Sequence, residues 1–353
     1  LMIRRPPRST HCISSAASDV YKRQAINTNS NLEEQDLNEL SIASSGLTEI
    51  KVKQVTAKAL AQRGKISKED IKDILEEKKQ VIARSEILEF FDAKSSQDDI
   101  GGLNVLKVWL NQRYRAFSKE ARDYGLPIPK GVLLVGAQGT GKSLTAKSIS
   151  KSWSMPLLRL DVGRLFSSLV GSSEARTRET ISRAEAMSPC ILWIDEIDKG
   201  FGGDARSDGG TSQRVLASLL TWMSEKESAV FVIATANAID KLPAELLRKG
   251  RFDEIFFLDL PNSEERSSIL DLHLKKRRPN YSFPLSTIID RTDGFSGAEL
   301  EQAVIEGMHI SFSENRELME KDLIKAVSEL VPLSRTAKEQ IDFLKEWLSL
   351  IHI

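Results

Sequence analysis

One octapeptide constrains the fold of this chain more than any other segment. Its residues are Gly136-Ala137-Gln138-Gly139-Thr140-Gly141-Lys142-Ser143, and they fit the pattern G-x-x-x-x-G-K-[ST]. The apolar run 131–135 leads directly into it, so we expect a buried parallel strand, a glycine turn and a helix that begins at Lys142. This arrangement points several unpaired backbone N–H groups at one anionic ligand. The segment therefore predicts a nucleoside triphosphate site, and the alternative is a plain glycine turn with an idle lysine.

Strand-like and helical segments alternate after the octapeptide. We expect strands at 157–160, 191–194, 230–234 and 254–258, and helices near 143–153, 173–187, 211–224 and 243–248. This alternation is typical of a parallel sheet with helices on both faces. After Pro261 the pattern is only helical, near 263–275, 285–290, 296–312 and 317–330, which predicts a second, lid-like subdomain.

The region before the octapeptide also has a helical pattern. Residues 39–91 read as a small helical subdomain, in which Ser67 and Asp70 have the spacing of a capping box. A charged linker, 92–99, leads to a helix over about 103–124, and Pro127 and Pro129 end that helix before the phosphate strand.

Both ends of the chain look foreign to the fold. Segment 1–24 is rich in Arg and Ser and poor in acids, as organellar transit peptides are, but it more closely resembles translated sequencing adapter. The last five residues, 349–353, have the same character. We expect neither segment to be native, so a true targeting signal is not visible here.

Composition excludes several classes of function. Of the 50 Lys+Arg and 50 Asp+Glu residues, segment 1–24 holds five and one, so the remainder is slightly acidic and nucleic-acid binding is not expected. Cysteine occurs only at Cys12 and Cys190, which indicates neither a disulfide framework nor a Cys/His metal site. The longest apolar runs fall short of the roughly 18 residues of a membrane span, so no span is expected.

A second motif follows the octapeptide, and it ends in two carboxylates. The apolar run 191–194 is followed directly by Asp195 and Glu196, which a buried strand would deliver to the carboxyl edge of the sheet beside the phosphate loop. There Asp195 would hold Mg²⁺ through water and Glu196 would polarise an attacking water. The alternative is a pair of acids that simply cap the strand.

Polar and basic residues follow the next predicted strand. Asn237 ends the segment VFVIATAN and would orient a lytic water, or it would merely form a turn. Arg248 and Arg251 then lie three residues apart in LLRKGRFD. Guanidinium groups suit spread phosphoryl charge, so these arginines could act on a neighbouring subunit's nucleotide, or they could belong to a solvated surface loop.

The order of these motifs resembles that of the AAA family of P-loop ATPases over about residues 98–330. Asp99-Ile100-Gly101-Gly102 corresponds to the edge of the adenine pocket, the octapeptide to Walker A, 191–196 to Walker B and 234–237 to the sensor 1 strand. Segment 246–253 corresponds to the second region of homology, and Gly297-Ala298-Glu299 to the sensor 2 part of the lid. The resemblance implies an α/β subdomain with a five-stranded parallel sheet of order 5-1-4-3-2 and a C-terminal helical lid.

The resemblance also implies roles for individual residues. ATP and Mg²⁺ are the implied ligands, and a homo-oligomer, a hexamer, is the implied assembly. The implied nucleotide contacts are Ile100, Gly101, Gly136, Ala137, Gln138, Gly139, Thr140, Gly141, Lys142, Ser143, Leu144, Gly297 and Ala298. Ser143 and Asp195 would hold the metal, Glu196 and Asn237 would serve catalysis, and Arg248 and Arg251 would act in trans.

Two further sequence segments are similar to those of the uncharacterised AAA family that is encoded in algal chloroplast genomes and found in cyanobacteria and other bacteria. The segments LRLDVGRLF (158–166) and 190–199 carry this similarity, which implies a bacterial cytoplasm or a chloroplast stroma as the location. That family has a degenerate AAA-like region ahead of its active module, and SGLTE (45–49) echoes SGAE in the lid. We therefore expect a helical region over 25–97, which is either the remnant lid of an upstream module or similar to a lid by chance. An ATPase subdomain over 98–261, a lid over 262–333 and a tail over 334–353 should follow it.

The segment that corresponds to the pore loop of this family departs from the usual pattern. Leu169, Val170 and Gly171 stand where protein-threading motors usually place an aromatic residue before a hydrophobic-Gly pair. Leucine offers less contact area and no ring stacking, which argues against strong processive unfolding. The Gly-rich stretch 200–210 reads as a second mobile pore loop or as an insertion without contacts.

Three functions compete at this point. The leading one is an ATP-hydrolysing hexameric motor that remodels a protein partner. The second is a nucleotide-gated regulator with slow turnover, which Leu169 and the lack of a His-Glu-x-x-His protease motif favour. The third, a P-loop kinase or nucleic-acid motor, fits poorly with the paired arginines and the slightly acidic charge.

Overall fold

A six-stranded sheet organises the chain in the computed structural model, which describes residues 36, 40, 43–44, 47, 49–67, 69–82, 87–91, 102–166, 172–201 and 211–351. The strands are β1 (Leu88–Phe91), β2 (Gly131–Gly136), β3 (Leu157–Leu160), β4 (Cys190–Ile194), β5 (Val230–Ala236) and β6 (Glu254–Leu258). Their order is β1-β3-β4-β5-β2-β6, and all neighbours are parallel except β1, which pairs antiparallel with β3.

The predicted five-stranded, all-parallel sheet is therefore wrong at one edge. The five parallel strands run β3-β4-β5-β2-β6, which is the expected arrangement of those five, but β1 adds a sixth strand of opposite direction. This strand lies within 39–91, which we expected to be only helical. Its four residues, LEFF, are too few to show the two-residue alternation that identifies a strand from sequence.

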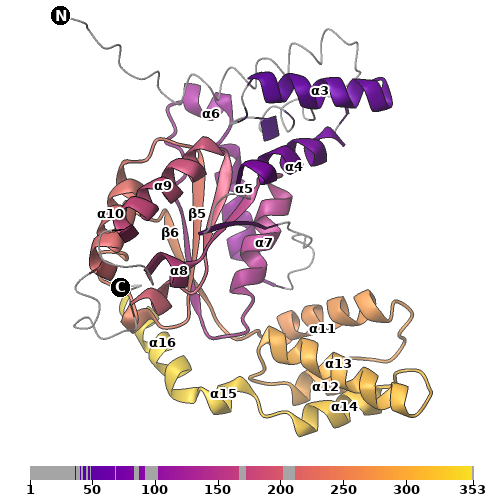
Figure 1. Cartoon of the computed structure of the whole chain (residues 1–353). Helices are drawn as coiled ribbons and strands as arrows, with labels where there is room; N and C mark the ends of the chain where they lie inside the picture. The colour runs from indigo at the N-terminus through magenta and orange to yellow at the C-terminus, as the bar shows by residue number, and fades with distance from the viewer. Residues whose placement is uncertain are drawn as a thin grey trace, which may run out of the picture.

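The sheet carries a hydrophobic core on each face, because successive side chains of a strand point to opposite sides. On β2, Val132 and Leu134 pack under α5 (Asn104–Arg115) and α7 (Lys142–Ser152). Leu133 and Val135 face the other side, which α8 (Val162–Phe166), α9 (Ser172–Ala186) and α10 (Thr211–Glu225) cover. Figure 1 shows these two helical layers on either side of the sheet.

Two predicted helices differ from the structure. The helix expected over 103–124 is broken into α5 and α6 (Lys119–Asp123), because Ser118 caps α6 by accepting from Ala121 N–H (3.2 Å). The helix expected over 243–248 is a series of turns, preceded by the short 3₁₀ segment η3 (Ile239–Lys241). Its bonds, such as Leu246 N–H to Pro243 O (2.9 Å), join residues three apart, since the chain must cross here from the end of β5 to the start of β6.

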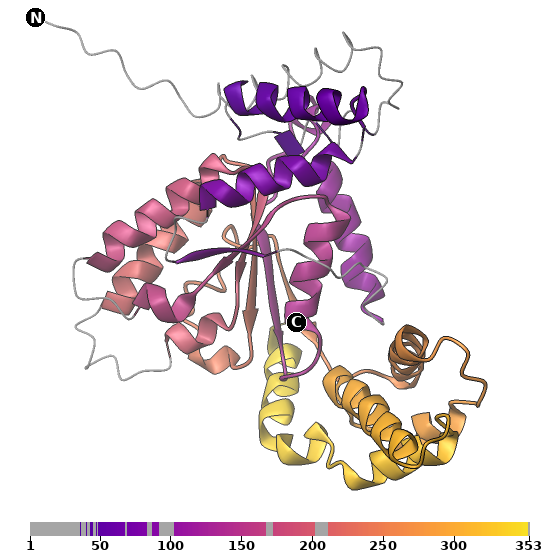
Figure 2. The ribbon, with the colours of Figure 1, turned by 45° about the vertical axis from the view of Figure 1, so that its right-hand side comes forward.

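The N-terminal helices form a small unit with a core of its own. Helices α3 (Glu49–Arg63) and α4 (Asp70–Ile82) pack together around apolar side chains that include Val52, Val55 and Ile74. Arg63 pairs with the buried Asp70, whose carboxylate also accepts from Ser67 N–H (3.1 Å) at the start of α4. In Figures 1 and 2 this unit lies at the end of the sheet opposite the lid.

The lid contains four helices around a separate apolar core. They are α11 (Ser263–Arg277), α12 (Ser286–Arg291), α13 (Gly297–Ser313) and α14 (Glu320–Glu329). Asn262 and Ser296 begin α11 and α13 with capping boxes, in which Glu265 and Glu299 bond back to the cap residue.

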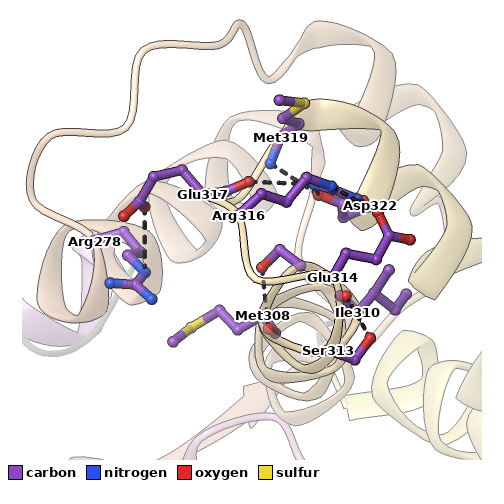
Figure 3. A network of polar contacts seen from close by, with 10 residues as sticks. Arg278, Met308, Ile310, Ser313, Glu314, Arg316, Glu317, Met319 and Asp322 are labelled. Carbon is purple, nitrogen blue, oxygen red and sulfur yellow. Dashed lines mark hydrogen bonds and ion pairs between the residues drawn. The ribbon is translucent and has the colours of Figure 1, made fainter.

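A charged network closes the outer end of the lid (Figure 3). Arg316 binds both oxygens of the buried Asp322 (2.6 Å each), and the same carboxylate accepts from Met319 N–H (3.0 Å). This pairing lowers the pKa of Asp322 and raises that of Arg316, because each charge stabilises the other. The network therefore fixes the turn between α13 and α14.

The segment expected to be a C-terminal tail is helical. It contains α15 (Leu333–Thr336) and α16 (Lys338–Ile351), and Figure 1 shows α16 returning from the lid toward the sheet. Leu344 is buried in the core on the α9 and α10 face, Gln340 Nε2 donates to Asn237 O (3.1 Å), and Lys345 pairs with Asp259 (3.2 Å). Among the described residues, no helix has the length and apolar character needed to cross a membrane.

Candidate nucleotide site

The phosphate loop joins β2 to α7, as the octapeptide predicts. Gly139 (φ 81°) and Gly141 (φ 89°) have left-handed backbones, which a side chain would strain. The first N–H groups of α7 have no partner within the helix, so they are free to face an anion. Thr140 Oγ1 closes the loop on itself by donating to Ala137 O (2.9 Å).

Lys142 is held inside the loop. Its side chain is 6% exposed, and Nζ donates to Gly136 O (2.8 Å) and to Ala137 O (2.6 Å). Burial lowers the pKa of Lys142 to about 8, although the nearby Asp198, Asp195 and Glu196 raise it. These two carbonyl oxygens carry no full charge. An anion bound in the loop would give the Lys142 ammonium a partner of opposite charge.

The two predicted metal ligands meet at the carboxyl edge of the sheet. Ser143 Oγ, at the start of α7, donates to Asp195 Oδ1 (3.0 Å), directly after β4. The buried Thr235 on β5 donates to the same oxygen (2.7 Å) and accepts from Glu196 N–H (2.8 Å). Thr235 therefore anchors both carboxylate residues to the neighbouring strand.

Glu196 has a left-handed backbone, and each of its two carboxylate oxygens contacts another side chain. Its φ of 50° and ψ of 52° are left-handed, which is uncommon for a residue with a side chain. Asn237 Nδ2 donates to Glu196 Oε1 (3.1 Å), and Lys199 Nζ pairs with Oε2 (2.6 Å). The hydrogen bond to Glu196 raises the pKa of Lys199.

Asp198 connects the ends of β4 and β5. It lies in the 3₁₀ turn η2 (Ile197–Gly200) and is 5% exposed. Its carboxylate accepts from Asn237 N–H (3.3 Å) and from Ala238 N–H (3.2 Å). The position of the Asn237 side chain against Glu196 therefore depends on Asp198.

A cation from the neighbouring strand faces Asp195. Arg159 on β3 has Nη2 at 3.8 Å from Asp195 Oδ2 and Nη1 at 3.8 Å from Glu89 Oε2 on β1. Its guanidinium lies over the ring of Trp193, at 5.3 Å from the centroid. Arg159 thus lies between Asp195 and the edge strand β1.

The lid contacts the phosphate loop directly. Ala298 N–H, in the first turn of α13, donates to Gly139 O (3.2 Å), and a Cβ on Gly297 would lie at 3.4 Å from the same oxygen. On another side, Glu265 of α11 accepts from Leu103 N–H (3.3 Å), next to the segment predicted to border the adenine. The structure therefore brings the predicted lid residues to the loop.

Arg248 and Arg251 lie away from this cluster. Both precede β6, where Glu254 pairs with Val132, whereas the phosphate loop follows Gly136, the partner of Leu258. Four strand residues span about 13 Å. The arginines therefore lie toward the end of the sheet where β2 and β6 begin, and the phosphate loop of the same chain lies at the opposite end. The Arg251 guanidinium donates to Glu245 O.

Some predicted site residues lie outside the described residues. These are Ile100, Gly101, Leu169, Val170 and Gly171, and most of the Gly-rich stretch 200–210. Gln138 and Leu144 are described, and they lie in the loop and in the first turn of α7.

The residues present fit a nucleotide with Mg²⁺. A buried ammonium, two left-handed glycines and a helix N-terminus suit phosphate, and a hydroxyl beside one carboxylate suits Mg²⁺, which keeps most of its waters. Within the described part of the chain, no group of three or more His, Cys, Asp or Glu residues could hold a metal by itself. The donors present at the end of β4, one hydroxyl and one carboxylate, fit a metal that is shared with phosphate oxygens.

Sequence reasoning missed four polar residues of this cluster: Thr235, Asp198, Lys199 and Arg159. The one available signal was position, because Thr235 lies two residues before Asn237 and Asp198 two residues after Glu196. Arg159 gave no signal, since a lone arginine within a predicted strand usually faces solvent.

Comparisons with known proteins give family matches for two parts of the chain. Residues 132–260 match the family described as "ATPase family associated with various cellular activities (AAA)", and residues 13–85 match "SpoVK-like AAA ATPase, second domain". The chain is 36% identical over 243 residues to the ATP-dependent zinc metalloprotease FtsH of Cyanidium caldarium, a match that covers 66% of this chain and 39% of that protein.

A second group of relatives is more similar to this chain. The chain is 51% identical over 321 residues to the uncharacterized AAA domain-containing protein ycf46 of Guillardia theta, which covers 90% of this chain and 63% of the relative. The corresponding protein of Pyropia yezoensis is 51% identical over 322 residues, covering 90% and 65%. The chain thus spans a little under two thirds of the length of these relatives. From the ordered motifs, the site geometry and these similarities, the chain belongs to the AAA family of P-loop ATPases and resembles the uncharacterised AAA proteins that algal plastid genomes encode.

Proposed function

We propose that this chain binds ATP with Mg²⁺ at the phosphate loop and hydrolyses it. The observation that carries the proposal is the continuous set of hydrogen bonds from Ser143 through Asp195 and Thr235 to Glu196 and Asn237. This set joins the residue that would hold the metal to the residues that would handle water. A glycine turn with an idle lysine would not require it.

Each residue has a physical task in this proposal. Lys142 and the N–H groups of the loop bind phosphate oxygens, and Ser143 and Asp195 would hold the metal. Bound Mg²⁺ supplies neutralisation of phosphate charge. Glu196 accepts a proton from the attacking water, and Asn237 orients that carboxylate and the water beside the γ-phosphate. Lys199 has to release Glu196 before the carboxylate can act as a base.

Two substitutions test this assignment. Lys142→Ala should abolish ATP binding, because it removes the buried cation of the loop. Glu196→Gln should retain binding, since glutamine has a similar shape, but it should hydrolyse ATP slower by a factor of about 100 or more. Binding is measured by calorimetry and turnover by phosphate release. Normal turnover in Glu196→Gln would remove Glu196 from its role.

The two arginines would complete the site of a neighbouring copy, in a ring that we propose to be a hexamer. They lie at the end of the sheet opposite the phosphate loop of their own chain, and this supports action in trans. Arg251→Ala protomers mixed with wild type should depress hydrolysis by their neighbours, so activity should fall faster than the wild-type fraction. Lys249→Ala, in the same loop, is the matched control. Activity strictly proportional to the wild-type fraction would refute the assignment.

ATP turnover would serve to remodel a protein client, and the similarity to the ATP-dependent protease FtsH over 243 residues supports this part of the proposal. Leu169→Ala should then impair unfolding of a tagged substrate while basal ATP hydrolysis stays intact. A second candidate is a nucleotide-gated regulator with slow turnover. The double hold of Asn237 and Lys199 on Glu196 favours it, because a paired carboxylate is a poor base. A wild-type protein that hydrolyses ATP but unfolds nothing would support the second candidate.

We also propose an origin and a location. The match of residues 13–85 to the second domain of SpoVK-like AAA ATPases supports the proposal that 25–97 contains the remnant lid of an upstream AAA module. The algal relatives support a chloroplast stroma, or a bacterial cytoplasm if the source is a bacterium. Fusion of the chain to a fluorescent reporter in an alga would test the first location.

A further inference from the structure

Three charged side chains form a line on one face of the sheet, from its edge strand to the metal aspartate. Glu89 on β1 lies directly opposite Arg159 on β3, and Arg159 lies opposite Trp193 on β4. Asp195 follows Trp193 by two residues. The carboxylates of Glu89 and Asp195 both lie at 3.8 Å from the guanidinium of Arg159, one on each side.

The local packing holds Arg159 in this place. Its guanidinium lies over the ring of Trp193, which is 2% exposed, and its Nε is buried with no hydrogen-bond acceptor among the described residues. The side chain therefore has few alternative positions that keep its partners. At 41% exposure it is still wet enough to shift toward either carboxylate.

The two oxygens of Asp195 have different partners. Oδ1 accepts from the hydroxyls of Ser143 and Thr235, whereas Oδ2 faces Arg159. A cation beside Oδ2 competes electrostatically with a metal ion at this carboxylate. Glu89 weakens that competition, because it draws the same guanidinium toward the edge strand.

We propose that Arg159 is a positioning residue that sets the Mg²⁺ affinity of the site through Asp195, and that Glu89 on the upstream strand moderates it. The proposal rests on the proposed function, in which Asp195 holds the metal. Its consequence is that docking of β1 onto β3 tunes the ATP site. An upstream segment that shifts β1 would thus change the Mg²⁺ requirement of the ATPase without contacting the nucleotide.

The test is a Mg²⁺ titration of the full chain with a fluorescent ATP analogue, read as the free Mg²⁺ concentration at half-saturation. Arg159→Gln should lower this concentration about two- to fivefold, because it removes the repulsion between the guanidinium and the metal ion. The Coulomb energy of two unit charges about 4 Å apart in water corresponds to a change in the binding constant of roughly that size. Glu89→Gln should raise it by a similar factor. The double variant should behave as Arg159→Gln alone, since Glu89 acts only through Arg159.

Two further variants control the experiment. Arg159→Lys retains the charge and should stay close to wild type, which also shows that the position tolerates substitution. Arg164→Gln removes another arginine that pairs with Glu89 (3.7 Å) and with Asp161 (3.2 Å), and it should change the half-saturation by less than about twofold.

Opposite shifts in the two single variants would support the proposal. Equal half-saturation in wild type, Arg159→Gln and Glu89→Gln would overturn it, and so would a Glu89→Gln effect that persists in the double variant. A wild-type chain that binds no ATP analogue at any Mg²⁺ concentration would instead refute the proposed function. The two failures are therefore distinguishable.

Discussion

Thr235→Val should release the carboxylates of the site while the shape of the β5 core stays the same. Valine fills the volume of threonine, but it removes two hydrogen bonds, from Oγ1 to Asp195 Oδ1 (2.7 Å) and from Glu196 N–H to Oγ1 (2.8 Å). The bond to the carboxylate is worth about 1.5–3 kcal/mol, and a buried N–H without an acceptor costs about 1–3 kcal/mol. Asp195 is partly exposed and can recruit water, so we expect a loss of about 2–4 kcal/mol in the free energy of unfolding.

The matched control is Thr235→Ser, which keeps the hydroxyl and deletes only a methyl group. It should cost about 1 kcal/mol. Urea unfolding followed by tryptophan fluorescence measures both variants, and phosphate release measures turnover. Because Glu196 has a left-handed backbone that Thr235 holds, Thr235→Val should also reduce kcat about tenfold or more with ATP affinity little changed. Equal stability and turnover in the two variants would refute the anchoring role of the hydroxyl.

Three other predictions follow from the same structure. Because burial lowers the pKa of Lys142 to about 8 and bound phosphate needs the charged form, ATP affinity should fall as the pH rises through 8, by up to about tenfold per pH unit; calorimetry at pH 7 and pH 9 measures this, and an unchanged affinity would contradict it. Gly139→Ala and Gly141→Ala both strain a left-handed backbone, at about 1–2 kcal/mol each, but only the first places a Cβ at 2.9 Å from Ser296 Oγ and 3.1 Å from Ala298 Cβ. Without nucleotide, Gly139→Ala should therefore have the lower melting temperature, and the reverse order would argue against the contact between lid and loop. Asp322→Asn should destabilise the lid by about 1–3 kcal/mol at pH 7, since it removes the buried carboxylate that binds Arg316 and leaves this guanidinium with the more exposed carboxylate of Glu314 (2.7 Å). Arg316 lowers the pKa of Asp322, so this stabilisation is present above the carboxyl's unfolded pKa and is lost as the pH falls through its lower folded value; urea unfolding from pH 7 down to pH 2 should show wild type and variant converging in acid.

The parts of the site that depend on local pattern could be predicted from sequence. A glycine turn between an apolar strand and a helix has one compact geometry, so the place of Lys142 and Ser143 followed from the octapeptide. Asp195 and Asn237 each follow an apolar strand of a parallel sheet, and such strands end at one edge. The contact between Asn237 and Glu196 is a direct result of that topology.

The remaining features depend on packing between segments far apart in the chain. Strand β1 is four residues long and pairs with β3 about seventy residues later, and nothing in LEFF identifies its partner. Thr235 and Arg159 acquire roles only because their side chains share a neighbourhood with Asp195. The break at Ser118 and the turns over 244–247 reflect a route that the chain must take, which overrides local helical preference.

The return of α16 to the sheet has a mechanical consequence for the lid. The lid leaves the large subdomain after β6 and comes back through α16, whose Leu344 is buried beside the sheet and whose Gln340 holds the backbone of Asn237. A rigid body that is attached to another at two points rotates about the line that joins them. Rotation of the lid about that line would displace the backbone of Asn237 each time the lid opens or closes.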